Sequence, residues 1–186
     1  MAKGLIEIRV HGRGGQGAVT TGQILAIAAF YDGKQSQTFP TFGVERGGAP
    51  VRAFCRISDK PINLREQSYN PDVVLVFEPS LVEIDNATEG LKKGGIVIIN
   101  SNKKPGEFKL KGFKVHTIDA TDAAIKIFGR AIGVNTAILG AFSKITKLIS
   151  IESLKKASDE IWLERKGQKI ADLNKKLMLE VYNTSK

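Results

Sequence analysis

A glycine-rich segment between a predicted strand and a predicted helix constrains this chain most. The segment Gly12–Gly17 contains the spacing G-x-G-x-x-G. It follows an apolar run at Leu5–Val10 and precedes Ala18–Tyr31, where apolar residues recur at helical spacing. Glycines in this context allow a tight turn, bring backbone N–H groups close to a phosphate, and let the helix pack on the strand. We therefore expect a phosphate-binding loop at a helix N-terminus, where the helix dipole favours an anion.

The residues after this helix argue against a dinucleotide of the NAD type. Such folds place an acidic residue about 20 residues beyond the glycines, where it binds the ribose hydroxyls. Here Ser36, Gln37 and Thr38 occupy that place. Asp32 comes too early, and Glu45 falls within a later loop. NAD is disfavoured, but two alternatives stay open: a stand-alone dinucleotide-binding oxidoreductase and a structural turn that binds no ligand.

Strands and helices alternate along the chain, which indicates one α/β domain over residues 1–186 with an open, mostly parallel sheet. A short strand near Gln35–Thr38 is expected to pair beside the first strand and complete a Rossmann-like opening unit. The glycines and prolines of Phe39–Pro50 predict a long ordered loop. Val51–Ile57 alternates in polarity, which is typical of a strand with one buried face, and places the Cys55 thiol in the core.

The remaining elements follow the same alternation. Short apolar runs at Val73–Phe77 and Ile96–Asn100 predict central strands buried on both faces. Ser80–Gly90 is expected to form a crossover helix between them. Further along, we expect a strand at Phe113–Ile118 and helices at about Ala120–Phe128 and Thr136–Lys147. Two amphipathic helices are expected to finish the chain, with apolar faces formed by Ile151, Leu154, Ala157 and Ile161 and by Ile170, Leu173, Leu177 and Val181.

Cysteine and histidine usage limits the chemistry of the chain itself. Cys55 is the one cysteine in the sequence, so neither an internal disulfide nor a cysteine-ligated iron–sulfur cluster is expected. His11 and His116 lie too far apart in sequence to suggest a metal site. No nucleophile–base pair is evident from spacing. Redox chemistry is therefore expected in a partner or a bound cofactor.

The net charge and the hydropathy of the chain limit the classes of partner that it is expected to bind. The net charge is +9, which we interpret mainly as a solvated basic surface, with an anionic ligand or acidic partner as the alternative. Nucleic acid is not expected, because no aromatic and basic interleaving accompanies the charge. Apolar runs fall short of the ~20 residues that a membrane helix needs, and no signal peptide is recognised. We expect a cytoplasmic protein that does not associate with membranes.

Several motifs together resemble one family. The stretches His11–Ala18 and Phe39–Phe54 resemble the gamma subunit of pyruvate:ferredoxin oxidoreductase, in the 2-oxoacid:ferredoxin oxidoreductase family. Ile57–Ile62 and Asn135–Phe142 are also of the family's type. The resemblance covers most of the chain, and the paired motifs are far more specific than the glycine pattern alone.

The resemblance implies a subunit of a larger enzyme. In the family, alpha, beta and delta chains accompany the gamma chain, and the partners hold thiamine diphosphate, magnesium and 4Fe–4S clusters. The assembly decarboxylates a 2-oxoacid, passes electrons to ferredoxin and yields an acyl-CoA. The isolated gamma chain is expected to be inactive, so no catalytic residue and no metal ligand is assigned to it.

The resemblance also implies which residues meet ligands and partners. Single-chain relatives use the corresponding loop in their coenzyme A site, but they usually carry an acidic residue at position 16 and a hydroxyl residue at position 18. Contact through backbone N–H groups is therefore favoured here. The residues implied in coenzyme A binding are Gly12, Gly14, Gly15, Gln16 and Gly17. The residues implied in facing a partner or cofactor are Arg13, Glu45, Arg46, Gly47 and Gly48.

The stretch Phe39–Phe54 indicates which 2-oxoacid is the substrate. Its sequence is similar to pyruvate-type and branched-chain-type gamma subunits rather than to the 2-oxoglutarate type. Pyruvate is the expected substrate, with a branched-chain or other 2-oxoacid as the alternative.

Overall fold

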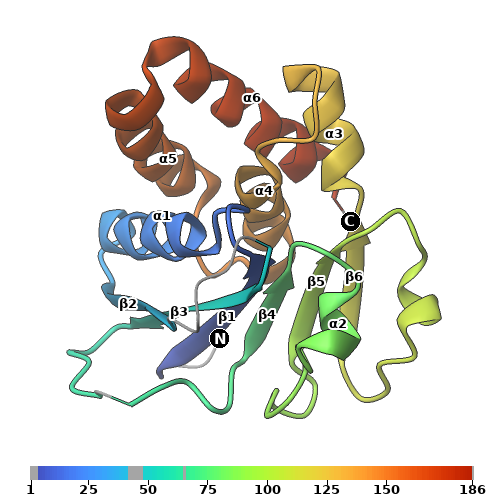
Figure 1. The fold of residues 1–186 in the computed structure, drawn as a ribbon. Helices are drawn as coiled ribbons and strands as arrows, with labels where there is room; N and C mark the ends of the chain where they lie inside the picture. The colour runs from blue at the N-terminus through green and yellow to red at the C-terminus, as the bar shows by residue number, and fades with distance from the viewer. Residues whose placement is uncertain (1–3, 42–47, 65, 186) are drawn as a thin grey trace.

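The structure is a computed structural model that describes residues 4–41, 48–64 and 66–185. Its centre is a six-stranded sheet with the order β2-β3-β1-β4-β5-β6 (Figure 1). Strands β1, β4, β5 and β6 are mutually parallel, and β3 is antiparallel to both of its neighbours. This confirms the predicted open, mostly parallel α/β sheet. The strands are β1 (Ile6–Arg13), β2 (Gln35–Thr41), β3 (Pro50–Ser58), β4 (Val73–Val76), β5 (Ile96–Asn100) and β6 (Lys114–Ile118).

The opening unit differs from the prediction in its strand pairing. Strand β2 does not lie beside β1, because β3 inserts between them and pairs with both. The β1–β3 register places Arg56 opposite Glu7, and Nε of Arg56 donates to Oε1 of Glu7 at 2.9 Å. A buried cation with its counter-ion on the neighbouring strand favours this arrangement. Such a long-range pair is not visible in the polarity pattern of one strand.

The expected loop at Phe39–Pro50 is shorter in the structure. Strand β2 continues to Thr41, and β3 begins at Pro50. The strand tolerates Pro40, which lacks an N–H group, because β2 is at the edge of the sheet. Residues 42–47 of the predicted loop lie outside the described residues.

Both faces of β3 are buried, contrary to the expectation of one. Phe54 and Arg56 have exposed fractions of only 3% and 1%. Phe54 stacks on Phe39 with ring centroids 5.3 Å apart, and the Arg56 guanidinium lies 5.2 Å from the Phe39 centroid. Cys55 on the opposite face is fully buried, and this burial raises its thiol pKa to about 12. The predicted core thiol is confirmed.

The long helices gather on one face of the sheet, as Figure 1 shows. They enclose the larger apolar core with the inward side chains of the strands. The second, smaller core lies on the other face, under α2 and the turn at Pro105–Phe108. The helices are α1 (Ala18–Tyr31), α2 (Leu81–Ile84), α3 (Ala120–Phe128), α4 (Val134–Thr146), α5 (Ile151–Lys166) and α6 (Gln168–Thr184).

Two helices depart from their predicted bounds. The crossover helix expected at Ser80–Gly90 is reduced to the four residues of α2. It ends there because the side chain of Asp85 is held by other elements, and Asn86 adopts a left-handed φ of 43°. Helix α4 begins at Val134 instead of Thr136, after Gly133 in the left-handed conformation.

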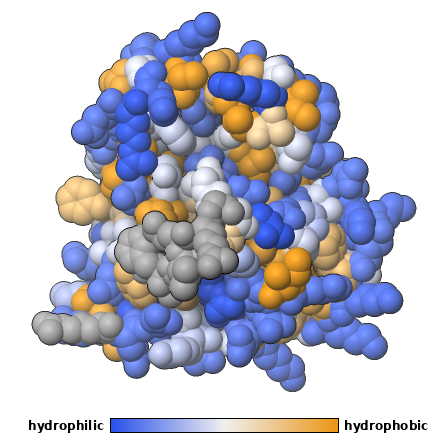
Figure 2. Space-filling view, in the orientation of Figure 1, coloured by the Kyte–Doolittle hydropathy of each residue, from blue (hydrophilic) through white to orange (hydrophobic). Residues whose placement is uncertain are grey.

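The surface is mainly hydrophilic on the face shown in Figure 2, with hydrophobic side chains interspersed. The lysines of the segment before and within β6 are exposed, namely Lys103, Lys104, Lys109, Lys111 and Lys114. Among the helices of the described ranges, none is long and apolar enough to cross a membrane.

Candidate functional site

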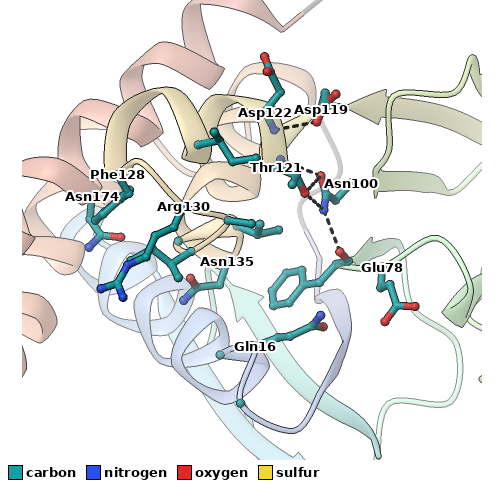
Figure 3. A pocket seen from close by; sticks show the side chains of 18 of the residues that line it. Gln16, Glu78, Asn100, Asp119, Thr121, Asp122, Phe128, Arg130, Asn135 and Asn174 are labelled. Carbon is teal, nitrogen blue, oxygen red and sulfur yellow. Dashed lines mark hydrogen bonds between the residues drawn. The ribbon is translucent and has the colours of Figure 1, made fainter. Parts of the chain in front are cut away.

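A cavity of about 880 Å³ lies at the carboxyl ends of the parallel strands (Figure 3). Its lining includes Gly15–Gly17 after β1, Phe77–Pro79 after β4 and Asn100–Asn102 at the end of β5. From β1 the chain builds β2 and β3 on one side, and then places β4 on the other side of β1. The cavity therefore lies at the topological switch point, where open α/β sheets bind ligands.

The glycine loop adopts conformations that favour glycine. Gly15 and Gly17 have φ values of 91° and 85°. A Cβ on Gly15 would meet open space, whereas one on Gly17 would lie 2.7 Å from Nδ2 of Asn135. Gly12 is still within β1, and a Cβ there would lie 3.0 Å from the Phe77 ring. Gly12 thus serves close packing, while Gly15 and Gly17 shape the cavity.

Part of the loop backbone is satisfied internally. The N–H of Gly14 donates to the carbonyl of Ala49 at 2.9 Å, and the N–H of Gln16 donates to the carbonyl of Arg13 at 2.9 Å. No side chain of the described residues caps the N-terminus of helix α1. The N–H groups of Gly15, of Gly17 and of the first turn of α1 find no acceptor within the described ranges.

The side chain of Gln16 has a defined role in the loop. Its Oε1 accepts from the N–H of Arg13 at 2.7 Å. An N–H donor requires the amide oxygen, so the orientation of the amide is fixed and Nε2 remains as a donor. Gln16, Gly15 and Gly17 line the cavity, whereas Gly12 and Gly14 do not. Coenzyme A binding by these five residues remains a prediction.

Arg13 is held within the chain. Its guanidinium pairs with the Glu78 carboxylate and donates to Oγ of Ser80 at 3.0 Å and to the carbonyl of Gly48 at 3.1 Å. The hydrogen bond from Arg13 lowers the pKa of Glu78. Arg13 therefore ties β1 to the segments after β4 and before β3. Gly48 is exposed with φ 81°. Glu45, Arg46 and Gly47 lie outside the described residues, and their interface role remains a prediction.

Sequence reasoning did not single out the opposite wall of the cavity. Nδ2 of Asn100 donates to the carbonyl of Phe77 at 3.0 Å and to Oγ1 of Thr121 at 2.9 Å. The Asp119 carboxylate caps α3 by accepting from the N–H of Asp122 at 2.8 Å. A polar residue at the carboxyl end of a buried strand, such as Asn100, was the available signal. These bonds fix the wall that faces the glycine loop.

A cluster of polar and charged side chains lies next to β1, outside the cavity lining; we call it the cluster behind β1. It consists of Arg9, His11, Arg52 and Asp85. Nδ1 of His11 and Oδ2 of Asp85 are 2.5 Å apart, and Nε of Arg9 donates to Nε2 of His11 at 2.9 Å. Arg52 pairs with both carboxylate oxygens of Asp85. Because Nε2 accepts, His11 carries its proton on Nδ1 and is neutral.

Burial determines how these groups titrate. Burial lowers the pKa of His11, which outweighs the opposing effect of Asp85. Burial would raise the pKa of Asp85, but the hydrogen bonds from His11 and Arg52 hold it well below its usual range. The cluster joins β1, β3 and the end of α2, so its role is to fix the strand that carries the glycine loop.

Comparison with known proteins identifies the family. The profile described as "Pyruvate ferredoxin/flavodoxin oxidoreductase" matches residues 7–184. The chain belongs to this family. The resemblance found in the sequence motifs is thereby confirmed.

Relatives of similar length share about half of the sequence. Pyruvate synthase subunit PorC of Methanothermobacter thermautotrophicus is 54% identical over 90% of this chain and 91% of that protein. The "Pyruvate/ketoisovalerate oxidoreductases common subunit gamma" of Thermococcus kodakarensis is 51% identical over 96% of both chains. The relatives that match nearly the whole chain are therefore subunits of oxidoreductases.

Solved structures agree with the fold. The crystal structure of pyruvate oxidoreductase subunit PORC from Thermotoga maritima superposes with a TM-score of 0.83, at 38% identity over 97% of both chains. A 2-oxoglutarate:ferredoxin oxidoreductase from Magnetococcus marinus superposes with a TM-score of 0.76. This chain covers 30% of that longer one at 24% identity, so the latter likeness concerns the fold alone.

Proposed function

We propose that this chain is the gamma subunit of a pyruvate:ferredoxin oxidoreductase that converts pyruvate, coenzyme A and oxidised ferredoxin to acetyl-CoA, CO2 and reduced ferredoxin. The observation that carries the proposal is the family match over residues 7–184, with PorC-type relatives that cover nearly the whole chain. Alpha, beta and delta chains would be its partners.

Thiamine diphosphate, magnesium and 4Fe–4S clusters are assigned to those partners. The single cysteine supports this assignment, because Cys55 is fully buried and its raised pKa keeps the thiol protonated. A 4Fe–4S cluster takes about four cysteine thiolates, which a single cysteine cannot supply. When bound in the complex, thiamine diphosphate supplies the carbanion chemistry of decarboxylation.

The contribution of this chain is to bind the anionic end of coenzyme A at the glycine loop. Gly15 and Gly17 present N–H groups beside the uncapped N-terminus of α1, in a cavity large enough for part of a nucleotide. Holding that end would orient the thiol toward the acyl group formed in a partner chain. The chain would thus act by positioning a substrate.

Co-purification tests the subunit assignment. A tag on this chain in its native cell is expected to recover further polypeptides together with thiamine diphosphate and a brown iron–sulfur chromophore. The recovered assembly should reduce ferredoxin with pyruvate and coenzyme A. A colourless single polypeptide that oxidises a substrate by itself would refute the assignment.

A pair of substitutions at Gly15 tests the coenzyme A role. A side chain there enters open space, and the φ of 91° strains Asp and Asn alike. In the assembled enzyme, Gly15→Asp should raise KM for coenzyme A at least about 10-fold, which corresponds to about 1.4 kcal/mol. Gly15→Asn should raise it less, because it adds no negative charge. KM for pyruvate should not change in either variant.

One relative favours a second substrate. The Thermococcus kodakarensis protein is named as a common subunit of pyruvate and ketoisovalerate oxidoreductases. The same chain can therefore be expected in a branched-chain 2-oxoacid enzyme. Turnover of the native assembly with pyruvate and with 2-ketoisovalerate distinguishes the two, and pyruvate is expected to give the higher kcat/KM.

A further inference from the structure

A second helix N-terminus opens onto the same cavity. Helix α4 is 13 residues long and begins at Val134, after Gly133 as the N-cap with φ 84°. No described side chain caps it, and its first turn contains no acidic residue. Gly133 and Asn135 line the cavity, as the glycine loop does. The two helices touch at this point, because Oγ1 of Thr21 in α1 lies 3.4 Å from the Asn135 carbonyl. Their positive ends therefore face one volume.

The side chain of Asn135 lies between these two ends. Its exposed fraction is 5%, and its amide makes no hydrogen bond to any other described residue. Nδ2 reaches the glycine loop closely enough to exclude a Cβ on Gly17. Figure 3 shows the amide directed into the cavity, on the same side as Gln16. Because Asn135 lines the cavity, a ligand there that accepts a hydrogen bond can be reached by Nδ2.

Charge is distributed unequally around the cavity. Arg130, shortly before α4, and Lys166, the last residue of α5, line it, and within the described ranges neither forms an ion pair. Two of the acids of the opposite wall are already paired, since Glu78 binds Arg13 and Asp122 lies 2.6 Å from Lys126. The third, Asp119, caps α3. The α1 and α4 side of the cavity is thus the side that attracts anions.

We propose that Asn135 and the N-terminus of α4 form the second half of the anion site, so that the cavity binds a diphosphate ester across both helix N-termini. One phosphoryl group would accept from the amides of the glycine loop, and the other from Nδ2 of Asn135 and the first turn of α4. The inference rests on the proposed function, because it specifies which part of coenzyme A this chain holds. It adds Asn135 as a specificity-determining residue.

Competition against coenzyme A in the assembled enzyme tests the proposal, with inorganic pyrophosphate and inorganic phosphate as probes. Pyrophosphate should inhibit at a concentration at least about 10-fold lower than phosphate, a difference of about 1.4 kcal/mol. Asn135→Ala removes the donor without adding charge, and should reduce this advantage about 5-fold. KM for pyruvate should stay unchanged.

A second variant, which adds a negative charge, separates an effect on coenzyme A binding from an effect on folding. Asn135→Asp has nearly the same shape, and a carboxylate in the first turn of a helix is favourable for the helix itself. This effect offsets the desolvation of a carboxylate at a position that is 5% exposed, so the Tm should stay close to that of the native enzyme. The variant should nevertheless raise KM for coenzyme A at least about 10-fold. Asn183→Asp, at an exposed site near the end of α6, makes the same charge change outside the cavity and should leave KM unchanged.

The outcomes separate this inference from the coenzyme A proposal. If pyrophosphate competes no better than phosphate, or if both Asn135 variants behave as the native enzyme, the diphosphate site is refuted. If Gly15→Asp still raises KM for coenzyme A in that case, the coenzyme A role stands without Asn135. If neither Gly15→Asp nor Asn135→Asp affects coenzyme A, both proposals fail.

Discussion

At the scale of single residues, Gly17 is constrained by its backbone and by its neighbour. Its φ of 85° disfavours other residues, and a Cβ would lie 2.7 Å from Asn135. Gly112 has a matching φ of 86° but open space around it. We predict that Gly17→Ala lowers the free energy of unfolding by about 2–4 kcal/mol, and Gly112→Ala by only about 1 kcal/mol. Chemical denaturation measures both, and equal losses would show that the contact with Asn135 is unimportant.

The cluster behind β1 predicts a pH dependence of stability. The folded pKa of His11 lies below 6.5 and that of Asp85 below 3.8, so the unfolded chain binds more protons at both sites as the pH falls. Stability contributed by the cluster is present at neutral pH. It declines below roughly pH 6.5 through His11 and further below roughly pH 4 through Asp85.

Removing Asp85 tests this prediction. Asp85→Ala leaves Arg52 and His11 without their acceptor, and should cost about 3 kcal/mol of unfolding free energy at pH 7. Without Asp85, which raises the pKa of His11, the folded pKa of His11 should fall further below its unfolded value. The variant should therefore lose more stability than the native chain between pH 7 and pH 4. Denaturant titrations at several pH values measure this, and parallel curves for the two proteins would contradict the assigned pKa directions.

The residues of the loop were predictable to different degrees. Gly15 and Gly17 could be placed from the sequence, because glycine spacing after a strand reflects local backbone geometry. The role of Gln16 could not, since its amide oxygen binds the N–H of Arg13, and an acidic side chain would accept the same bond. Asn135 was missed as a site residue because it meets the loop only through the tertiary packing of α4.

At the scale of elements, the α4–α6 contact depends on Gly140. A Cβ at this position would lie 2.1 Å from the carbonyl oxygen of Met178 and 3.0 Å from the N of Tyr182. We predict that Gly140→Ala forces the helices apart and costs about 3 kcal/mol of unfolding free energy. Gly106→Ala has open space and should be neutral or stabilising by up to about 1 kcal/mol. A neutral Gly140→Ala would mean that the helices separate without cost.

Helices with local signals were predicted, whereas pairings that depend on distant residues were not. Helices α1 and α3 have the expected bounds, because apolar spacing and end signals lie within each segment. The position of β3 between β1 and β2 depends on Arg56 and Glu7, which are far apart in sequence. The shortness of α2 likewise depends on the contacts of Asp85 with β1 and β3.

At the scale of the whole molecule, the chain has a cavity of about 880 Å³, and under the proposed function it depends on partner chains for the redox chemistry. We predict that the purified chain alone shows no pyruvate-dependent reduction of ferredoxin or of an artificial electron acceptor. Adding the partner chains should restore activity in proportion to the amount of this chain. Activity of the isolated chain, or full activity of the partners without it, would contradict the subunit assignment.

The central claim is that this chain holds the anionic end of coenzyme A while partner chains carry out the redox chemistry. A structure of the assembled enzyme with coenzyme A bound tests it most directly. We predict diphosphate oxygens within about 3 Å of the amides of Gly15 and Gly17 and of Nδ2 of Asn135. Coenzyme A bound with its phosphates on another chain, and with the glycine loop free of ligand, would contradict the claim.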